Sequence, residues 1–407
     1  MKTILILGSG KDQLSAIVKA KELGLKVISC DKNKHAVGKK ASDIFWNISN
    51  QNINKLKLKI KKYNNKNDKI DGVFVIGSDI PDIASKLSGL VKFNIYKRFP
   101  SINAKNKLLM KKTFTKFKIP TSIFKEIKSF KDLINFIKKH KTDIVIKPLD
   151  RSGARGVFLL KKDLRLKQIK SLYEKTKNVT KKNSIIAEIF LKGLQISTES
   201  IVVNQKIKTI AYADRNYEHL NLFEPNIIEN GGSMPSSLSI KKKYKINKLL
   251  NKVAKSFRIS DGTIKGDIII SNKSIYLVEI AHRLSGGDFS ESLIPLNTGI
   301  DFIGLSIKQA LGEKISLAKI KVKNKNVVLN RYFFPKPGIL KKVSNIKKIK
   351  NFSFIKKLEL NYKLNDKIPK IENHADRAGV FIVIAKNKNV GMKRVKYVYS
   401  KLKFYIN

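Results

Sequence analysis

Short apolar runs near the start of the chain place the strongest constraint on the fold. Thr3–Leu7 is a continuous run that ends in Gly8-Ser9-Gly10, and Lys26–Cys30 is a second run. A third covers residues 71–76. Apolar residues at helical spacing separate the first two runs, and strands this apolar are buried on both faces, as in parallel sheets. The sequence therefore predicts a βαβ unit in an open, doubly wound parallel sheet.

The same segment contains part of a dinucleotide-binding fingerprint. Gly8-Ser9-Gly10 follows a predicted strand, and Asp31 stands about twenty residues further on. Gln13 occupies the position where a third glycine would bring helix against strand. A nicotinamide cofactor therefore stays an alternative that the pattern does not favour, since Asp31 could simply end its strand.

Length and composition limit the class of protein. At 407 residues the chain is long enough for two or three domains. Its hydrophobic residues, 42% of the total, form runs well short of the roughly 18 that a membrane span needs. The first ten residues are too short and too strand-like for a signal peptide. Cys30 is the only cysteine, so disulfide and zinc frameworks are excluded. We expect a cytoplasmic protein with no membrane partner.

The charge of the chain is extreme but diffuse. Lys and Arg number 85 against 31 Asp and Glu, a formal net charge of +54. Such an excess raises nucleic acid as a partner. However, the basic residues are mostly Lys, spread over the whole chain and accompanied by abundant Ile and Asn, as an AT-rich coding sequence would produce. The pattern favours a solvated basic surface and no specific nucleic-acid partner. A nucleic-acid binder, whose affinity would fall steeply with salt, is the alternative.

The rest of the chain alternates helical and strand patterns without internal repeats. Pro120 ends a basic helical pattern that begins near Ser101. The further expected elements are strands within 143–160 and 183–210, a helix over 245–257, a hairpin of 262–270 and 274–280 that turns at 271–273, a strand over 380–384, and a final amphipathic helix.

One predicted hairpin has the composition of a phosphate clamp. Lys147 lies at the end of the buried run Ile144–Pro148, and a glycine-bearing turn follows it. The lysine would supply a point charge and the turn would supply backbone N–H groups to a phosphate. The turn residues are Ser152, Gly153, Ala154, Arg155 and Gly156. The alternative is an ordinary hairpin with an edge lysine.

Two carboxylates on a second predicted hairpin indicate a metal site. Asp267 and Glu279 stand on what we expect to be adjacent antiparallel strands. Side by side they would repel each other unless a cation lay between them. Mg²⁺ takes one or two protein carboxylates together with phosphate oxygens. Arg283 follows and could stabilise a transferring phosphoryl group or a substrate carboxylate. The alternative is a surface salt bridge between Glu279 and Arg283.

In this order, these residues resemble the ATP-grasp superfamily, most closely the branch with biotin carboxylase and the carboxylate–amine ligases. The resemblance rests on Lys107, on Lys147 with its loop, on Glu188, on Asp267 and on Glu279-Ile280-Ala281-His282-Arg283-Leu284-Ser285-Gly286-Gly287. It covers nearly the whole chain and implies an α/β fold of three parts. These parts are an N-terminal open parallel-sheet domain at 1–100, a two-lobed ATP-grasp core at 101–312 and a small C-terminal α+β domain at 325–407.

The resemblance also implies roles for single residues. Lys107 and Lys147 would bind the nucleotide, and Ser152 to Gly156 would close over its phosphates. Glu188, Ile189 and Phe190 would form the hinge strand that holds the adenine amino group. Asp267 and Glu279 would bind Mg²⁺, or Mn²⁺ in its place. Arg283, at the acyl-phosphate centre, and Lys147 would be the catalytic residues.

Other positions depart from the superfamily or match it loosely. Ala281 replaces the usual Asn two residues beyond the second metal carboxylate, which puts a second metal in doubt. Gln195 replaces the acid expected to contact the ribose. Glu199, Ser285 and Gly286 are expected near the substrate. Residues 229–235, which begin with Glu229, resemble an acceptor-side loop or, alternatively, an ordinary Gly/Pro turn.

The implied activity is an ATP-dependent ligation. A small-molecule carboxylate would be activated as an acyl phosphate and captured by an amine, with release of ADP and phosphate. Two alternatives stay open: activation of bicarbonate in the manner of the carboxylase members, and nucleotide binding without turnover, with Ala281 marking a decayed site. A homodimer is compatible with the resemblance.

Overall fold

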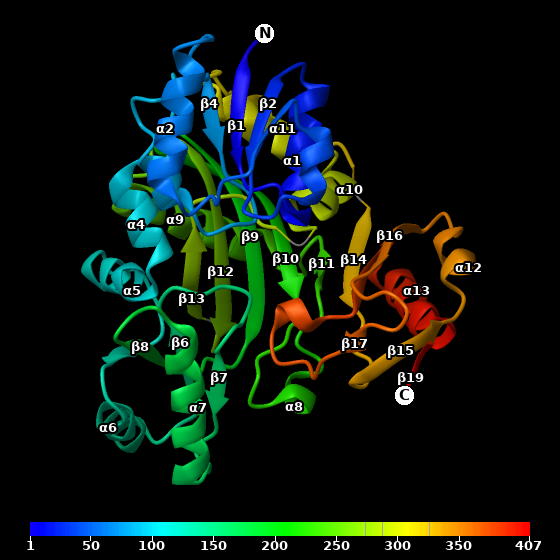
Figure 1. Ribbon diagram of the computed structural model, residues 1–407. Coiled ribbons are helices and arrows are strands. Elements are labelled where there is room, and N and C mark those ends of the chain that lie inside the picture. The colour runs from blue at the N-terminus through cyan, green and yellow to red at the C-terminus, as the bar shows by residue number, and fades with distance from the viewer. Residues whose placement is uncertain (273, 287, 325) are drawn as a thin grey trace.

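The computed structural model describes residues 1–272, 274–286, 288–324 and 326–407. Lys273, in the predicted hairpin turn, and Gly287, in the predicted glycine pair, lie outside the described residues. The described residues form four β-sheets, surrounded by helices (Figure 1). None of the helices in these ranges combines the length and the apolar character of a membrane span.

The N-terminal segment folds into a four-stranded parallel sheet, as predicted. Its strand order is β3–β2–β1–β4. All five residues of β1 are buried, as parallel strands covered on both faces require. The elements are β1 (Thr3–Leu7), α1 (Lys11–Glu22), β2 (Lys26–Cys30), β3 (Ile44–Trp46), α2 (Ile53–Asn64), β4 (Gly72–Phe74) and α3 (Pro81–Ser85).

An eight-stranded antiparallel sheet occupies the centre of the molecule (Figure 1). Its order is β13–β12–β9–β10–β11–β14–β18–β16. The strands are β9 (Leu194–Val203), β10 (Lys206–Arg215), β11 (Gly232–Met234), β12 (Gly262–Ser271), β13 (Ser274–Ala281), β14 (Val327–Tyr332), β16 (Ile355–Leu360) and β18 (Gly379–Ala385). The last three come from the predicted C-terminal domain. We therefore propose that this domain shares its sheet with the predicted core.

Two smaller sheets complete the fold. One has the order β5–β8–β6–β7 and forms the lobe that carries Lys147. This lobe contains β5 (Phe124–Ile127), α6 (Phe130–His140), β6 (Ile144–Pro148), β7 (Phe158–Leu160), α7 (Leu166–Val179) and β8 (Ile185–Ile189). The other, near the C-terminus, has the order β17–β15–β19. It is formed by β15 (Gly338–Val343), β17 (Lys367–Ile368) and β19 (Phe404–Ile406), with α12 (Ile346–Lys350) and α13 (Lys388–Lys401) nearby.

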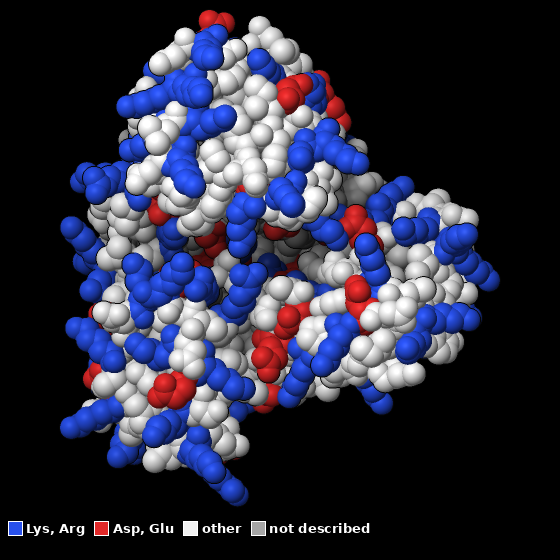
Figure 2. Space-filling view, viewed as in Figure 1, with Lys and Arg blue, Asp and Glu red and all other residues white. Residues whose placement is uncertain are grey.

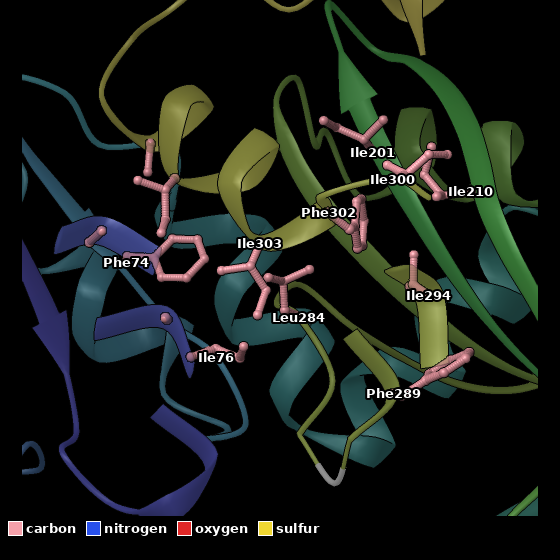
Figure 3. Packing of buried hydrophobic residues seen from close by; sticks show 14 of the residues in the cluster. Phe74, Ile76, Ile201, Ile210, Leu284, Phe289, Ile294, Ile300, Phe302 and Ile303 are labelled. Carbon is pink, nitrogen blue, oxygen red and sulfur yellow. The ribbon is translucent and has the colours of Figure 1, made fainter. Parts of the chain in front are cut away.

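A continuous apolar core joins the N-terminal sheet to the central sheet. Phe74 and Ile76 belong to the same buried cluster as Ile201 on β9 and Ile210 on β10. Figure 3 shows Phe302 and other side chains of the intervening helices α10 (Ile294–Thr298) and α11 (Phe302–Ala310) filling the space between them. Each fully buried side chain of this kind contributes about 1.5–3 kcal/mol. The cluster therefore fixes the N-terminal sheet against one end of the central sheet.

The helical pattern predicted from Ser101 onward is two helices, α4 (Arg98–Lys105) and α5 (Lys107–Lys116). Asn106 separates them because its side chain accepts hydrogen bonds from the backbone N–H groups of Leu108 and Leu109. An Asn in this position satisfies N–H groups that a helix start leaves unpaired. The break places Lys107 in the first turn of α5.

Two further segments differ from the sequence-based expectation. The helix predicted over 245–257 is α9 (Ile240–Ser256), and it begins earlier because Ser239 caps it by accepting from the backbone N–H of Lys242. The segment 229–235 was expected to be an acceptor-side loop or an ordinary turn, and part of it is neither. Residues Gly232–Met234 are β11, a strand of the central sheet that pairs with β10 and β14.

Candidate active site

Three adjoining cavities lie in the hollow at the centre of the molecule (Figure 2). Their volumes are about 470, 210 and 110 Å³. Lys265 on β12 lines all three. On the face shown in Figure 2, Lys and Arg are dispersed rather than gathered into one patch, which favours the solvated-surface interpretation of the charge.

The two predicted metal carboxylates face each other across β12 and β13. Asp267 and Glu279 are direct partners in the antiparallel register. Asp267 accepts a hydrogen bond from Ser197 Oγ at 2.6 Å, and Glu279 pairs with Lys107 Nζ at 3.2 Å. The attraction of the Lys107 ammonium is stronger than the opposing effect of burial, and it holds the pKa of Glu279 far below its usual value. Lys107 therefore favours the ionised form of Glu279, which is the form that a cation would bind.

Glu188 on β8 holds two lysines in a buried ion cluster. Its carboxylate lies 2.8 Å from Lys111 Nζ and 3.0 Å from Lys147 Nζ. Burial alone would raise the pKa of Glu188, but the two ammonium groups outweigh it and lower the pKa to about 2. Burial lowers the pKa of Lys111, which is 1% exposed. Sequence reasoning missed Lys111, although its spacing of one helical turn from Lys107 places both on one face of α5.

The predicted phosphate loop joins the paired strands β6 and β7. Gly153, Ala154 and Gly156 have positive φ values of 68°, 62° and 67°. A Cβ added at Gly156 would lie 2.4 Å from Val179, so glycine is required there on two counts. The carbonyl of Gly153 accepts a hydrogen bond from the backbone N–H of His374 at 3.1 Å. The C-terminal segment therefore fixes one side of the loop over the cavities.

The 210 Å³ cavity brings together most of the predicted nucleotide-binding residues. Its lining contains both predicted metal carboxylates and also apolar side chains, among them Val145, Ile227 and Ile269. From the predicted set, the lining contains Lys107, Lys147, Ser152, Gly153, Ala154, Glu188, Ile189, Phe190, Gln195, Asp267 and Glu279. Arg155 lines the 470 Å³ cavity instead. An apolar slot beside lysines and carboxylates suits a flat heterocycle with phosphates attached.

Arg283 pairs with Asp79 of the N-terminal segment, 204 positions away, with Nε 2.8 Å from Oδ1. The alternative of a surface salt bridge between Arg283 and Glu279 is therefore wrong, because Arg283 is buried and pairs with Asp79. Arg283 lines the 470 Å³ and the 110 Å³ cavities, which Ser152 and Gly153 also line. Burial would lower the pKa of Arg283, but Asp79 outweighs it and raises the pKa. The guanidinium is therefore a fixed positive charge at the meeting point of the cavities.

Glu199 stands behind the cavity wall rather than in it. It is fully buried, and its Oε1 accepts a hydrogen bond from the backbone N–H of Ser285 at 2.9 Å. Its Oε2 has no hydrogen-bond partner among the described residues. Burial raises the pKa of Glu199 to about 7. Ser285 and Gly286 do line the 470 Å³ cavity, so Glu199 reaches that cavity only through Ser285.

Glu229 lies in the 470 Å³ cavity among arginines that sequence reasoning missed. Its carboxylate pairs with Arg215 and lies 3.5 Å from Nη2 of Arg377. The Arg377 guanidinium stacks on Tyr332, 3.8 Å from the ring centroid. The sequence could have drawn attention to these arginines, because arginine is rare in a chain whose basic residues are mostly lysine. The fixed, bidentate donors of arginine suit recognition of a carboxylate or phosphate.

In the turn Gly8-Ser9-Gly10, two backbone N–H groups already donate hydrogen bonds to side chains of the N-terminal segment. The backbone N–H of Gly10 donates to Gln13 Oε1 at 3.1 Å, and that of Ser9 donates to Asp31 Oδ2 at 3.1 Å. A dinucleotide would need those N–H groups for its pyrophosphate and Asp31 for its ribose. The structure therefore speaks against the nicotinamide alternative.

The carboxylate pair fits a single hard cation. In the described ranges no group of three or more His, Cys, Asp and Glu side chains is placed to hold a metal by itself. Mg²⁺ does not need such a group, because it usually takes one or two carboxylates and completes its shell with phosphates and water. Asp267 and Glu279 supply those two carboxylates on a wall of the cavity that suits a nucleotide.

The chain is similar to several known proteins in sequence or in fold. The family described as phosphoribosylglycinamide synthetase, ATP-grasp (A) domain, matches residues 105–287. A phosphoribosylamine–glycine ligase from Caldanaerobacter subterraneus subsp. tengcongensis is 23% identical over 345 residues, 81% of this chain and 79% of that protein. A phosphoribosylglycinamide synthetase structure from Anaerococcus prevotii has a TM-score of 0.75 at 21% identity and covers 100% of both chains. The L-amino acid ligase structure from Bacillus licheniformis has a TM-score of 0.83 at 16% identity, over 100% of this chain and 99% of that one.

Proposed function

We propose that the chain is an ATP-dependent ligase of the ATP-grasp type, which joins a small-molecule carboxylate to an amine and releases ADP and phosphate. The observation that carries the proposal is the pairing of Asp267 with Glu279 on one wall of a cavity that also contains Lys107, Lys147 and the glycine loop. This set supports phosphoryl transfer, in which positioning and charge neutralisation supply most of the catalysis.

The cavities suggest where each reactant binds. We assign adenine to the 210 Å³ cavity, between Val145 and Ile269, and the terminal phosphates to the 110 Å³ cavity beside Lys107 and Arg283. The carboxylate and the amine would share the 470 Å³ cavity near Arg215 and other arginines. Arg283 lines both the phosphate and the substrate cavity, so it is placed where the phosphoryl group would be transferred.

The reaction then runs in two steps. A carboxylate oxygen attacks the γ-phosphorus of ATP and ADP leaves, which gives an acyl phosphate. Lys107, Lys147 and Arg283 offset the negative charge that spreads over the transferring group. When bound by Asp267 and Glu279, Mg²⁺ would supply further charge neutralisation and hold the phosphate oxygens in place. The amine nitrogen next attacks the acyl carbon, phosphate leaves, and the amine gives up a proton.

The loop from Ser152 to Gly156 has a protective role in this scheme. An acyl phosphate reacts readily with water, so the site must exclude water until the amine attacks. The loop lies over the cavities and is tied to the C-terminal segment by the His374–Gly153 hydrogen bond. We propose that this contact holds the loop closed during the reaction.

The test is ADP release with Mg²⁺ and pooled carboxylates and amines, with a bicarbonate-only arm. We expect release that requires an organic carboxylate and falls at least about 100-fold in Glu279→Gln. Glu313→Gln, a change at an exposed glutamate paired with Lys2, is the matched control and should behave as wild type. Release with bicarbonate alone would indicate a carboxylase-type reaction. ATP binding without release in any arm would indicate a non-catalytic homologue.

We also propose a cytoplasmic location, because the one cysteine, Cys30, is buried and leaves the chain without disulfides to form. A homodimer is a further proposal that rests on the resemblance alone. Sedimentation of the purified protein would test it.

A further inference from the structure

Four side chains at the candidate metal site occupy two neighbouring cross-strand pairs. Lys265 pairs with Ala281, and Asp267 pairs with Glu279. Residues two apart on a strand point to the same face, so all four point toward the cavities. One pair therefore presents two carboxylates, and the other presents an ammonium opposite a methyl group.

The ammonium of Lys265 already neutralises one of the carboxylates. Its Nζ lies 2.5 Å from Asp267 Oδ2, while Asp267 Oδ1 accepts the Ser197 hydroxyl. The backbone of Lys265 is held by β9 on one side and β13 on the other, because β12 lies between them. The side chain of Lys265 is only 16% exposed. Its charge therefore lies beside the carboxylate pair and is not carried on a mobile surface chain.

Ala281 adds nothing that could bind a metal. A hard cation needs oxygen ligands, and an alanine side chain offers none. Two carboxylates with an additional oxygen ligand could share two divalent ions. Here the extra ligand is absent from position 281, and a positive charge stands across the strand from that position. A second divalent ion would meet Lys265 at short range inside a partly enclosed cavity, where like charges repel strongly.

We propose that Lys265 takes the place of a second metal ion, so that the nucleotide site holds one divalent cation and uses the lysine ammonium as its other positive charge. The inference rests on the proposed ATP site and deepens it. Lys265 lines the cavities assigned to adenine, to phosphates and to substrates, so its ammonium can contact the phosphates or the substrate carboxylate once the metal binds Asp267.

The test is a count of bound Mn²⁺, measured from the electron paramagnetic resonance signal of free Mn²⁺. The protein is saturated with a non-hydrolysable ATP analogue at one analogue per chain, and binding of the labelled analogue is measured separately by equilibrium dialysis. Four proteins are compared: wild type, Lys265→Arg, the double variant Lys265→Met with Ala281→Asn, and Lys206→Ala. Lys206 is an exposed lysine at the start of β10, outside the site.

We expect one Mn²⁺ per complex in wild type, Lys265→Arg and Lys206→Ala, and two in the double variant. Its second ion should bind at least about tenfold more tightly than any second ion in wild type. Two ions in wild type, or one ion in all four proteins, would overturn the role of Lys265 while leaving ATP binding intact. Failure of the analogue to bind wild type would instead overturn the proposed function, and this inference with it.

Discussion

Removal of Lys111 isolates the contribution of the buried ion cluster. Lys111 is 1% exposed, and its ammonium lies 2.8 Å from Glu188 and 2.6 Å from the hydroxyl of Thr121. In Lys111→Met, the carboxylate of Glu188 keeps only Lys147 as an ionic partner among the described residues. A buried charge that loses a partner is costly, whereas a methionine fills nearly the same volume without one.

The size of the effect follows from the pKa of Glu188. The ordinary value for a glutamate is 4.5, and the cluster lowers it to about 2. A shift of this size corresponds to about 3 kcal/mol of stability. Because the pKa is lowered in the folded state, this stability is complete above about pH 4.5 and is lost as the pH falls toward 2. Lys111 supplies the larger share, so Lys111→Met should cost about 2 kcal/mol at pH 7.

The assay is urea unfolding followed by circular dichroism at pH 7, with two controls. Lys112→Met changes the exposed neighbour on the same helix and should stay within about 0.5 kcal/mol of wild type. In a Glu188→Gln background, Lys111→Met should cost less than about 1 kcal/mol, because no buried carboxylate is left unpaired. If Lys111→Met costs no more than Lys112→Met, or the same in both backgrounds, the cluster does not stabilise the fold and the reasoning is refuted.

Three further predictions concern the groups around the cavities. Burial raises the pKa of Glu199 from 4.5 to about 7, so the folded protein loses stability as the pH rises through this range. In Glu199→Gln, the free energy of unfolding should lose about 3 kcal/mol of its pH dependence between pH 4.5 and 7.5, as measured by unfolding at several pH values. Arg283→Met should lower ADP release at least about 100-fold while ATP binding by dialysis changes less than tenfold, and equal losses in both would contradict its assigned place at the transferring group. Removal of divalent ions with EDTA should stop ADP release and Mg²⁺ should restore it, whereas release that persists in EDTA would exclude a metal-dependent reaction.

Many of the helices and strands could be predicted from the sequence. Continuous apolar runs such as Thr3–Leu7 predicted the parallel sheet, because strands covered on both faces have no polar alternation. The hairpin that carries Asp267 and Glu279 was predicted from two apolar segments around a short turn, and the two residues are direct partners. Such features depend on residues close together in the chain, where spacing alone fixes the geometry.

Ion pairs between distant segments were not predictable in the same way. Arg283 meets Asp79 across 204 positions, and Glu229 meets Arg377 across 148. The pattern of one sequence does not indicate which of many charged residues become buried together. The same limit applies to the continuation of the central sheet into the C-terminal segment. β11 pairs with β14, and β14 pairs with β18. The sequence did not indicate this continuation, because the residues of β11 were predicted to form a loop or turn. The roles assigned to the individual site residues therefore stay predictions.

Transfer of ¹⁸O from a carboxylate to inorganic phosphate tests the central claim most directly. The enzyme is given ATP, Mg²⁺, amines and carboxylates labelled with ¹⁸O, and the released phosphate is analysed by mass spectrometry. Activation of the carboxylate as an acyl phosphate predicts one ¹⁸O atom in each phosphate formed, and no label transfer in Glu279→Gln. Phosphate that is released in step with ADP but carries no ¹⁸O would mean that water, not a carboxylate, attacks ATP, and would contradict the account.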